Sequence, residues 1–143
     1  MKFKSKKDLF FSVLILGLNA YLIGVISFGL FSKNIETQDL LTILLILGVV
    51  GLLFWLYFET HYELSKEAGL IYRSGPFSGK IKIDRITEIV KGKTLWVGLK
   101  PATARKGLIV KYDKYNEIYI SPKTNDSFIE KILELKNDIK ISE

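Results

Sequence analysis

The chain contains no cysteine and a single histidine, His61. Disulfides, thiolate nucleophiles and cysteine-ligated zinc sites are therefore excluded, and a structural zinc site, which takes about four Cys or His ligands, cannot be assembled. Sequence runs of the forms GxxxxGK[ST], GxGxxG and GxSxG are also missing, so neither a phosphate-binding loop nor a nucleophile elbow is indicated. We expect no catalytic residue, no metal and no cofactor, and predict that the protein is not an enzyme.

Charged residues are missing from two long apolar stretches, residues 9–31 and 40–58. As helices rising about 1.5 Å per residue, both are long enough to cross a hydrocarbon core of about 30 Å. Backbone amides in lipid need internal hydrogen-bond partners, so both stretches are predicted to be transmembrane helices. A cleaved signal peptide is the alternative for the first stretch, but that run exceeds the usual ~7–15 apolar residues and lacks a small-x-small cleavage site.

Flanking charge orients the two spans. The formal net charge is +6, and lysines 2, 4, 6 and 7 precede the first span, whereas the short link 32–39 carries one lysine and two acids. The positive-inside rule then makes residues 1–8 a basic cytoplasmic N-terminus, residues 32–39 an external loop and residues 59–143 a cytoplasmic domain. We therefore expect a multi-pass protein of the cytoplasmic cell membrane with both termini in the cytoplasm.

Small residues recur along both spans, at Gly17, Ala20, Gly24, Gly48 and Gly51. Such residues let helix backbones approach closely in lipid, so these positions are expected to pack against another helix. Asn19 lies near the middle of the first span, where an unpaired amide costs free energy. Its side chain is expected either to bond to a backbone carbonyl or to pair across a homo-oligomer interface.

After residue 59 the hydrophobic period changes from that of a helix to that of a strand. Alternation predicts strands over residues 61–64, 70–74, 77–84, 86–91, 94–97, 108–112 and 117–121. Residues 98–106 are expected to form a long loop. Residues 125–136 are expected to form a helix with an apolar stripe of Phe128, Ile132, Leu135 and Ile139. The predicted fold is a membrane α-hairpin followed by a mainly β barrel or sandwich that a C-terminal α-helix closes.

Several stretches of this part resemble a known family. They are YEL (62–64), GLIYRSGPF (69–77), IKIDRIT (81–87), LIVKY (108–112) and ISPK (120–123), followed by Phe128. The order of these predicted elements is that of the pleckstrin-homology (PH) superfold. The residues of the stretches are similar to those of the bacterial PH-like domain family of small membrane proteins, formerly a domain of unknown function. The resemblance covers about residues 59–135. It implies a PH-like fold behind two N-terminal transmembrane helices, and it implies no activity. Residues 100–106 depart from the Ser- and Arg-containing segment of the family.

Basic residues supply the candidate binding surface. They are Lys80, Lys82, Arg85, Lys91, Lys93, Arg105 and Lys106. On a domain tethered to an anionic leaflet, each nearby Lys or Arg contributes about 1 kcal/mol of attraction. The alternative is a solvated face that only satisfies the positive-inside rule. Phosphoinositide-binding PH domains use a basic strand-turn-strand edge, which this chain does not reproduce residue for residue.

Three functions are compatible with these features. The first is a protein-interaction or scaffolding module at the cytoplasmic face, and the second is a sensor of anionic lipid headgroups that uses a basic strand edge. The third is an accessory subunit of a transport complex, although the spans hold no Asp, Glu, Lys or Arg to line a pathway. The expected partners are the lipid bilayer and either a second copy or another membrane protein. Nucleic acid is not expected, because no aromatic-basic binding motif occurs.

The orientation can be tested with tags. A reporter fused after Glu143 should be active only in a cytoplasmic format, and a tag within residues 32–39 should be labelled from outside, because the flanking lysines keep both termini inside. Protection assays with a membrane-impermeant label measure both. External labelling of the C-terminus would contradict this orientation.

Overall fold

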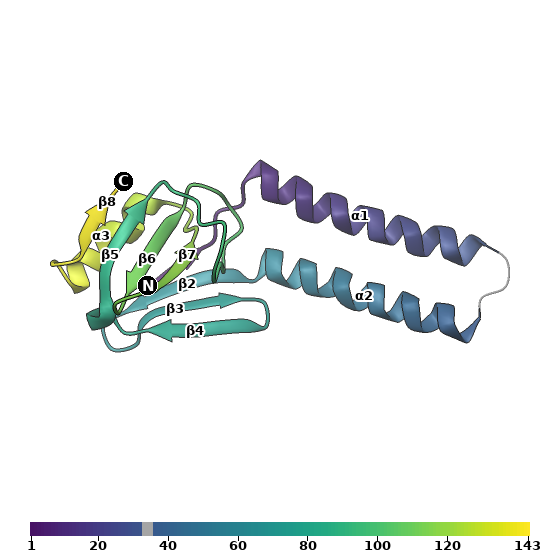
Figure 1. Ribbon diagram of the computed structural model, residues 1–143, viewed down its shortest axis with the longest axis horizontal. Helices are drawn as coiled ribbons and strands as arrows, with labels where there is room; N and C mark the ends of the chain where they lie inside the picture. The colour runs from purple at the N-terminus through teal and green to yellow at the C-terminus, as the bar shows by residue number, and fades with distance from the viewer. Residues whose placement is uncertain (33–35) are drawn as a thin grey trace.

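The computed structural model describes residues 1–32 and 36–143. It consists of a long helical hairpin and a β domain at one end of it (Figure 1). The helical hairpin is formed by α1 (Leu9–Phe31) and α2 (Thr37–Phe58), which lie side by side. By length and composition each helix could cross a membrane, with mean hydropathies of 2.3 and 2.6. The start of α1 and the end of α2 both meet the β domain.

The helix bounds follow from local capping signals. α1 coincides with the predicted span 9–31 and starts immediately after Asp8, whose side chain caps the N-terminus of the helix. α2 begins before the predicted residue 40, because the Asp39 side chain accepts a hydrogen bond from the Glu36 N–H at 2.9 Å and so satisfies one free donor of the first turn. The predicted external loop, residues 32–39, lies partly outside the described residues.

The two helices meet along a seam with steps of three and four residues. Its buried and half-buried positions are Ser12, Ile15, Asn19, Leu22 and Ile26 in α1, and Ile43, Ile46, Val50, Leu53 and Tyr57 in α2. This spacing keeps one stripe of each helix against its neighbour. At the domain end of the seam the Ser12 and Tyr57 hydroxyls lie 2.7 Å apart. Most of the other apolar side chains of the two helices are exposed.

The small residues of the spans lie outside this seam. Gly17, Gly24, Gly48 and Gly51 are exposed, and a Cβ atom at any of them would meet no heavy atom within 4 Å; Ala20 is exposed as well. These positions therefore do not mediate the contact between α1 and α2, which the branched and longer seam residues make instead. Packing against a helix of another molecule stays a prediction.

Asn19 is buried in the seam rather than placed among the small residues. Its Nδ2 donates to the Ile15 carbonyl at 3.0 Å, which is the backbone bond that was one of the two expectations. Its Oδ1 has no hydrogen-bond partner among the residues that the structure describes.

Two four-stranded sheets form the β domain. The first has the order β1 (Lys2–Lys4), β2 (Thr60–Ser65), β3 (Gly69–Ser74), β4 (Phe77–Ile81). The second has the order β7 (Asn116–Ile120), β6 (Leu108–Tyr112), β5 (Ile86–Lys91), β8 (Lys140–Ser142). A 3-10 turn, Ile83–Arg85, joins the sheets, and α3 (Asn125–Leu135) follows β7. The predicted fold class, a sandwich-like β domain with a C-terminal helix behind two apolar helices, is confirmed.

The C-terminus differs from the expectation. α3 ends at Leu135, so Ile139 is not part of its apolar stripe; Ile139 lies instead on the segment that leads into β8, and it is buried in the core. β8 pairs in parallel with β5, whereas the other strand pairs are antiparallel. The predicted strand over residues 94–97 is absent, and that segment belongs to the long loop between β5 and β6.

The N-terminal residues, predicted as a separate basic tail, are part of the first sheet. β1 pairs antiparallel with β2, with Lys2 opposite Glu63 and Lys4 opposite His61. The amino group of Met1 donates to the Leu64 carbonyl at 2.5 Å. The β domain is therefore built from chain segments on both sides of the helical hairpin.

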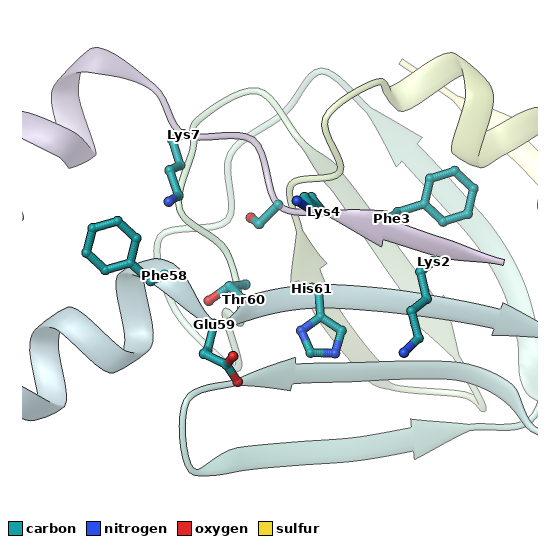
Figure 2. A pocket seen from close by; sticks show the side chains of 9 residues that line it. Lys2, Phe3, Lys4, Lys7, Phe58, Glu59, Thr60 and His61 are labelled. Atoms are coloured by element: carbon teal, nitrogen blue, oxygen red, sulfur yellow. The ribbon is translucent and has the colours of Figure 1, made fainter.

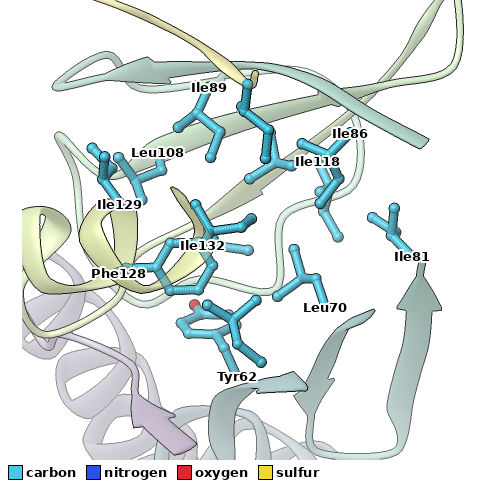
Figure 3. Packing of buried hydrophobic residues seen from close by; sticks show 14 of the residues in the cluster. Tyr62, Leu70, Ile81, Ile86, Ile89, Leu108, Ile118, Phe128, Ile129 and Ile132 are labelled. Atoms are coloured by element: carbon cyan, nitrogen blue, oxygen red, sulfur yellow. The ribbon is translucent and has the colours of Figure 1, made fainter. Parts of the chain in front are cut away.

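The core lies between the two sheets and α3 (Figure 3). Its fully buried members include Tyr62, Leu70, Ile86, Ile89, Leu108, Ile118, Phe128 and Ile132. Phe128 contributes the largest side chain of α3, and the ring of Phe3 from β1 packs edge-on against it at 5.2 Å between centroids. Alternate residues of each strand point to opposite faces, so the strands supply the core with every second side chain.

A network of hydroxyl groups joins the N-terminal segment to both sheets. Ser5 Oγ lies 3.1 Å from Tyr62 OH, 2.9 Å from Ser121 Oγ and 2.9 Å from Thr103 Oγ1. Tyr62 OH donates to the Pro101 carbonyl at 2.5 Å and accepts the Ser121 N–H at 3.0 Å. Burial raises the pKa of Tyr62, so the phenol keeps the proton that it donates. Four segments that are distant in sequence are held together here.

Replacing Phe128 with Ala should lower the free energy of unfolding by about 3–5 kcal/mol, because a large buried ring leaves a cavity. Denaturant titration of the full chain in micelles, followed by near-ultraviolet circular dichroism, measures this. Tyr115→Ala is the control, since that ring is 86% exposed and surface changes usually stay within about 0.5 kcal/mol. Equal effects of the two substitutions would show that α3 is not part of the core.

Replacing Tyr62 with Phe removes one oxygen atom and should cost about 1–3 kcal/mol, because the buried Ser121 N–H and Pro101 carbonyl lose their partner. Tyr112→Phe serves as the matched control, since its ring is only half-buried. The same titration compares them. A Tyr62→Phe protein as stable as the parent would mean that the network contributes nothing to joining the four segments.

Candidate functional site

The candidate site lies where the helical hairpin joins the β domain. α2 ends at Phe58, and one residue later the chain enters β2. On the other side, Asp8 caps α1 by accepting the Phe11 N–H at 2.8 Å, and it also accepts the Arg105 N–H at 2.9 Å. Burial by itself would raise the pKa of Asp8, but these hydrogen bonds and the Arg105 charge outweigh it and hold the pKa below its usual value. The charged carboxylate thus ties the loop between β5 and β6 to the start of α1.

Three basic side chains lie opposite one another on the outer face of the first sheet. Lys4 of β1 faces His61 of β2, which in turn faces Arg73 of β3, and Ser78 of β4 lies beyond Arg73. We call Lys4, His61 and Arg73 the basic row. Side chains opposed in this way have Cβ atoms about 4.5–5.5 Å apart, so the three side chains lie close to one another. Among the described residues, no ion pair with an acid neutralises any of the three.

One end of the basic row opens into a hollow of about 430 Å³ beside the end of α2 (Figure 2). Lys2, Lys4, Lys7 and His61 are among its lining residues, with Glu59 as the acid. The Lys7 ammonium lies 4.3 Å from the centroid of the Phe58 ring. A hollow with three lysines and one glutamate favours an anionic group, and charge-assisted hydrogen bonds from lysine suit phosphate oxygens.

The basic row occupies the end of the sheet that is nearest to the helices. His61 follows Glu59, the C-cap residue of α2, by two residues, or about 7 Å of extended chain. The turn between β3 and β4 lies at the same end, because a Cβ atom on Gly75 would sit within 3.4 Å of Leu56 in the last turn of α2. Gly75 also has a positive φ of 54°, which glycine adopts without strain.

The basic residues chosen from the sequence fall into separate places. Lys80 lies near the end of β4 that points away from the helical hairpin, and Lys82 and Arg85 follow it there (Figure 1). Arg85 is paired with Asp113, whose Oδ1 accepts the Arg85 Nε–H at 2.7 Å. This contact raises the pKa of Arg85 and lowers that of Asp113. The predicted strand edge is therefore remote from the helices, and one of its charges is neutralised.

A second hollow, of about 240 Å³, brings together other members of the predicted set. Lys91, Arg105 and Lys106 line it with Lys6 and Lys123. Lys91 pairs with Asp126 at 2.5 Å and Arg105 with Asp8 at 3.1 Å, so two of its cations already have partners. Lys93 lies apart in the loop between β5 and β6.

Sequence reasoning missed the basic row because its members come from three strands. In the sequence, Lys4 indicated only the topology, His61 was considered only as the single histidine, and Arg73 was not selected. The turn at residues 66–68 between β2 and β3 would have placed His61 opposite Arg73, but the pairing of β1 has no local signal. Among the described residues, no group of three His, Cys, Asp or Glu side chains could hold a metal ion.

Comparison with known proteins agrees with this architecture. A family model described as "Bacterial PH domain" matches residues 60–136, more than half of the chain and the part from β2 through α3. "Uncharacterized protein YyaB" of Bacillus subtilis (strain 168) is 28% identical over 109 residues, which cover 76% of this chain and 74% of that protein. No solved structure matches. The resemblance predicted from the sequence is confirmed, and the chain belongs to the bacterial PH domain family.

Proposed function

We propose that the chain is a membrane-anchored, non-enzymatic PH-like module whose basic row contacts the phosphate groups of anionic lipids in the cytoplasmic leaflet. The observation that carries this proposal is the placement of Lys4, His61 and Arg73, without acidic partners among the described residues, beside the two helix ends. The family membership supports a non-enzymatic role.

The exposed surface of the helical hairpin supports a membrane location. Only 11% of the most apolar window of each helix is buried inside the chain, so most of its leucine, valine and phenylalanine side chains need another apolar environment. The lysines that precede α1 favour a cytoplasmic position for the domain. In that placement α1 and α2 cross the membrane, and both termini stay in the cytoplasm.

The electrostatics of the basic row suit a lipid phosphate. A row about 7 Å beyond the end of α2 lies within the ~8 Å over which charges act at physiological salt. The planar guanidinium of Arg73 can bind two phosphate oxygens at once, and Lys4 supplies a second positive charge on the same face of the sheet, two strands away. An anionic headgroup therefore gains more here than it does at the distant Lys80, Lys82 and Arg85.

Two other roles have weaker support. A scaffold for another protein was the first expectation from the sequence, but the basic row lies at the helix end of the β domain, where lipid is the nearest partner. An accessory role in transport would need a polar path through the helices, and the polar side chain of Asn19 is sealed within the seam.

Lipid retention tests the proposal. The full chain is reconstituted in mixed phosphatidylglycerol and phosphatidylcholine, extracted gently and examined for bound lipid by native mass spectrometry. The double variant Lys4→Gln, Arg73→Gln should lose about 2 kcal/mol of attraction, or about thirty-fold in phosphatidylglycerol retention. The loss should shrink at high salt because surface charges are screened.

The matched control is Lys80→Gln, Lys82→Gln, which removes the same charge from the distant end of β4 and the residue just after it. It should retain phosphatidylglycerol almost as well as the parent chain. Equal losses in both variants would show that net charge, and not the basic row, attracts the lipid. No loss in either would favour a protein partner for this surface.

A further inference from the structure

The loop between β5 and β6 carries an apolar stretch that the core does not use. Trp96, Val97 and Leu99 are 68%, 81% and 48% exposed. They lie between Lys93 and Lys100 in the chain. We call residues 95–99 the tip of the loop; it is apolar and has a lysine on each side. Clusters of large exposed apolar side chains mark places where a protein meets another surface.

The loop is held in place from both sides, so the exposure of its tip is imposed by the fold. Leu95 packs against the small cluster of Val90, Ile109 and Tyr119. The Leu99 carbonyl accepts the Tyr119 N–H at 3.0 Å. Lys100 Nζ donates to the Trp96 carbonyl at 2.5 Å, which closes the tip on itself.

The tip lies at the level where α1 leaves the domain. Leu95 and Trp96 share an apolar hollow of about 190 Å³ with Phe11, the third residue of α1. On the α2 side, the turn between β3 and β4 reaches Leu56, and Phe77, the first residue of β4, is 61% exposed. Exposed apolar side chains of the β domain thus stand beside both helices, at the depth of their first and last turns.

We propose that residues 95–99 insert Trp96 and Val97 into the boundary between headgroups and acyl chains of the leaflet that α1 and α2 enter. Lipid is the favoured occupant because the tip continues the exposed apolar surface of α1, and because lysines flank it in the chain on both sides. Tryptophan concentrates at this boundary, and apolar faces enter it by about 5–10 Å.

This insertion fixes the orientation of the β domain relative to the membrane. Two helices alone leave the β domain free to tilt about the line that joins their ends. The loop beside α1 and the turn beside α2 add contacts away from that line, and they keep the basic row against the lipid. The inference rests on the proposed membrane placement of the helical hairpin, but it does not depend on headgroup binding by the basic row.

Tryptophan fluorescence in vesicles tests the insertion. The chain has two tryptophans, so Trp55→Phe leaves Trp96 as the sole emitter, and Trp96→Phe leaves Trp55 in α2. Each full-length variant is reconstituted in phosphatidylglycerol–phosphatidylcholine vesicles whose acyl chains are brominated near the headgroup or near the midplane. We expect blue-shifted Trp96 emission that shallow bromines quench more strongly than deep ones.

A matched pair in the Trp55→Phe background extends the test. Val97→Asp places a charge in the tip and should abolish the quenching of Trp96, whereas Val97→Leu should preserve it. Trp96 emission that is red-shifted and unquenched, while Trp55 is quenched in its own variant, would overturn the insertion and leave the membrane placement intact. Blue-shifted but unquenched Trp96 would show a protein cover and would also overturn it.

The remaining outcomes separate this inference from the proposed function. If neither tryptophan is quenched, the membrane placement fails and the insertion fails with it. If Trp96 is quenched while Lys4→Gln, Arg73→Gln retains lipid like the parent chain, headgroup binding by the basic row fails and the insertion stands.

Discussion

The pairing of β1 with β2 is the contact on which the rest of the structure depends. It joins the residues that precede the helical hairpin to those that follow it, and it sets Lys4 opposite His61. The hydroxyl group of Ser5 then anchors this segment to Tyr62 and Ser121, so the hydroxyl groups buried where the segment meets the two sheets have hydrogen-bond partners. Two residues further on in the same segment, Lys7 reaches the Phe58 ring and Asp8 starts α1. The segment that pairs in the sheet therefore also makes the contacts that join the domain to the helices.

Much of the fold could be predicted because local periodicity carries it. The two apolar spans, the strand pair of β6 and β7 and the face of α3 that holds Phe128 all follow from patterns within a few residues of one another. β1 and β8 have three residues each, too few for a period, and their partners are distant in the chain. Residues 94–97 show an alternation but form no strand, because Gly92 and Gly98 on either side adopt positive φ angles that interrupt the extended backbone.

The candidate site was harder to predict, since charge in a sequence carries no information about which charges are neutralised or which end of a domain faces the membrane. Lys91 and Arg105 look free in the sequence, yet Asp126 and Asp8 pair with them from other elements. Lys80 and Lys82 stand out because they share one strand, but that strand carries them away from the helices. The basic row is visible only when three strands are in register.

The position of β1 ahead of the helical hairpin has a consequence for biosynthesis. The ribosome makes Lys2–Lys4 before the two apolar helices, but their partner strand, Thr60–Ser65, emerges only after both helices have been made. The β domain therefore cannot close until the helical hairpin has left the ribosome and its two ends have come together. In a nascent chain whose helices fail to pair, the edge of β2 stays open and the Phe3 ring is missing from its place beside Phe128. Open strand edges and exposed apolar surface are features that quality-control proteases and chaperones detect.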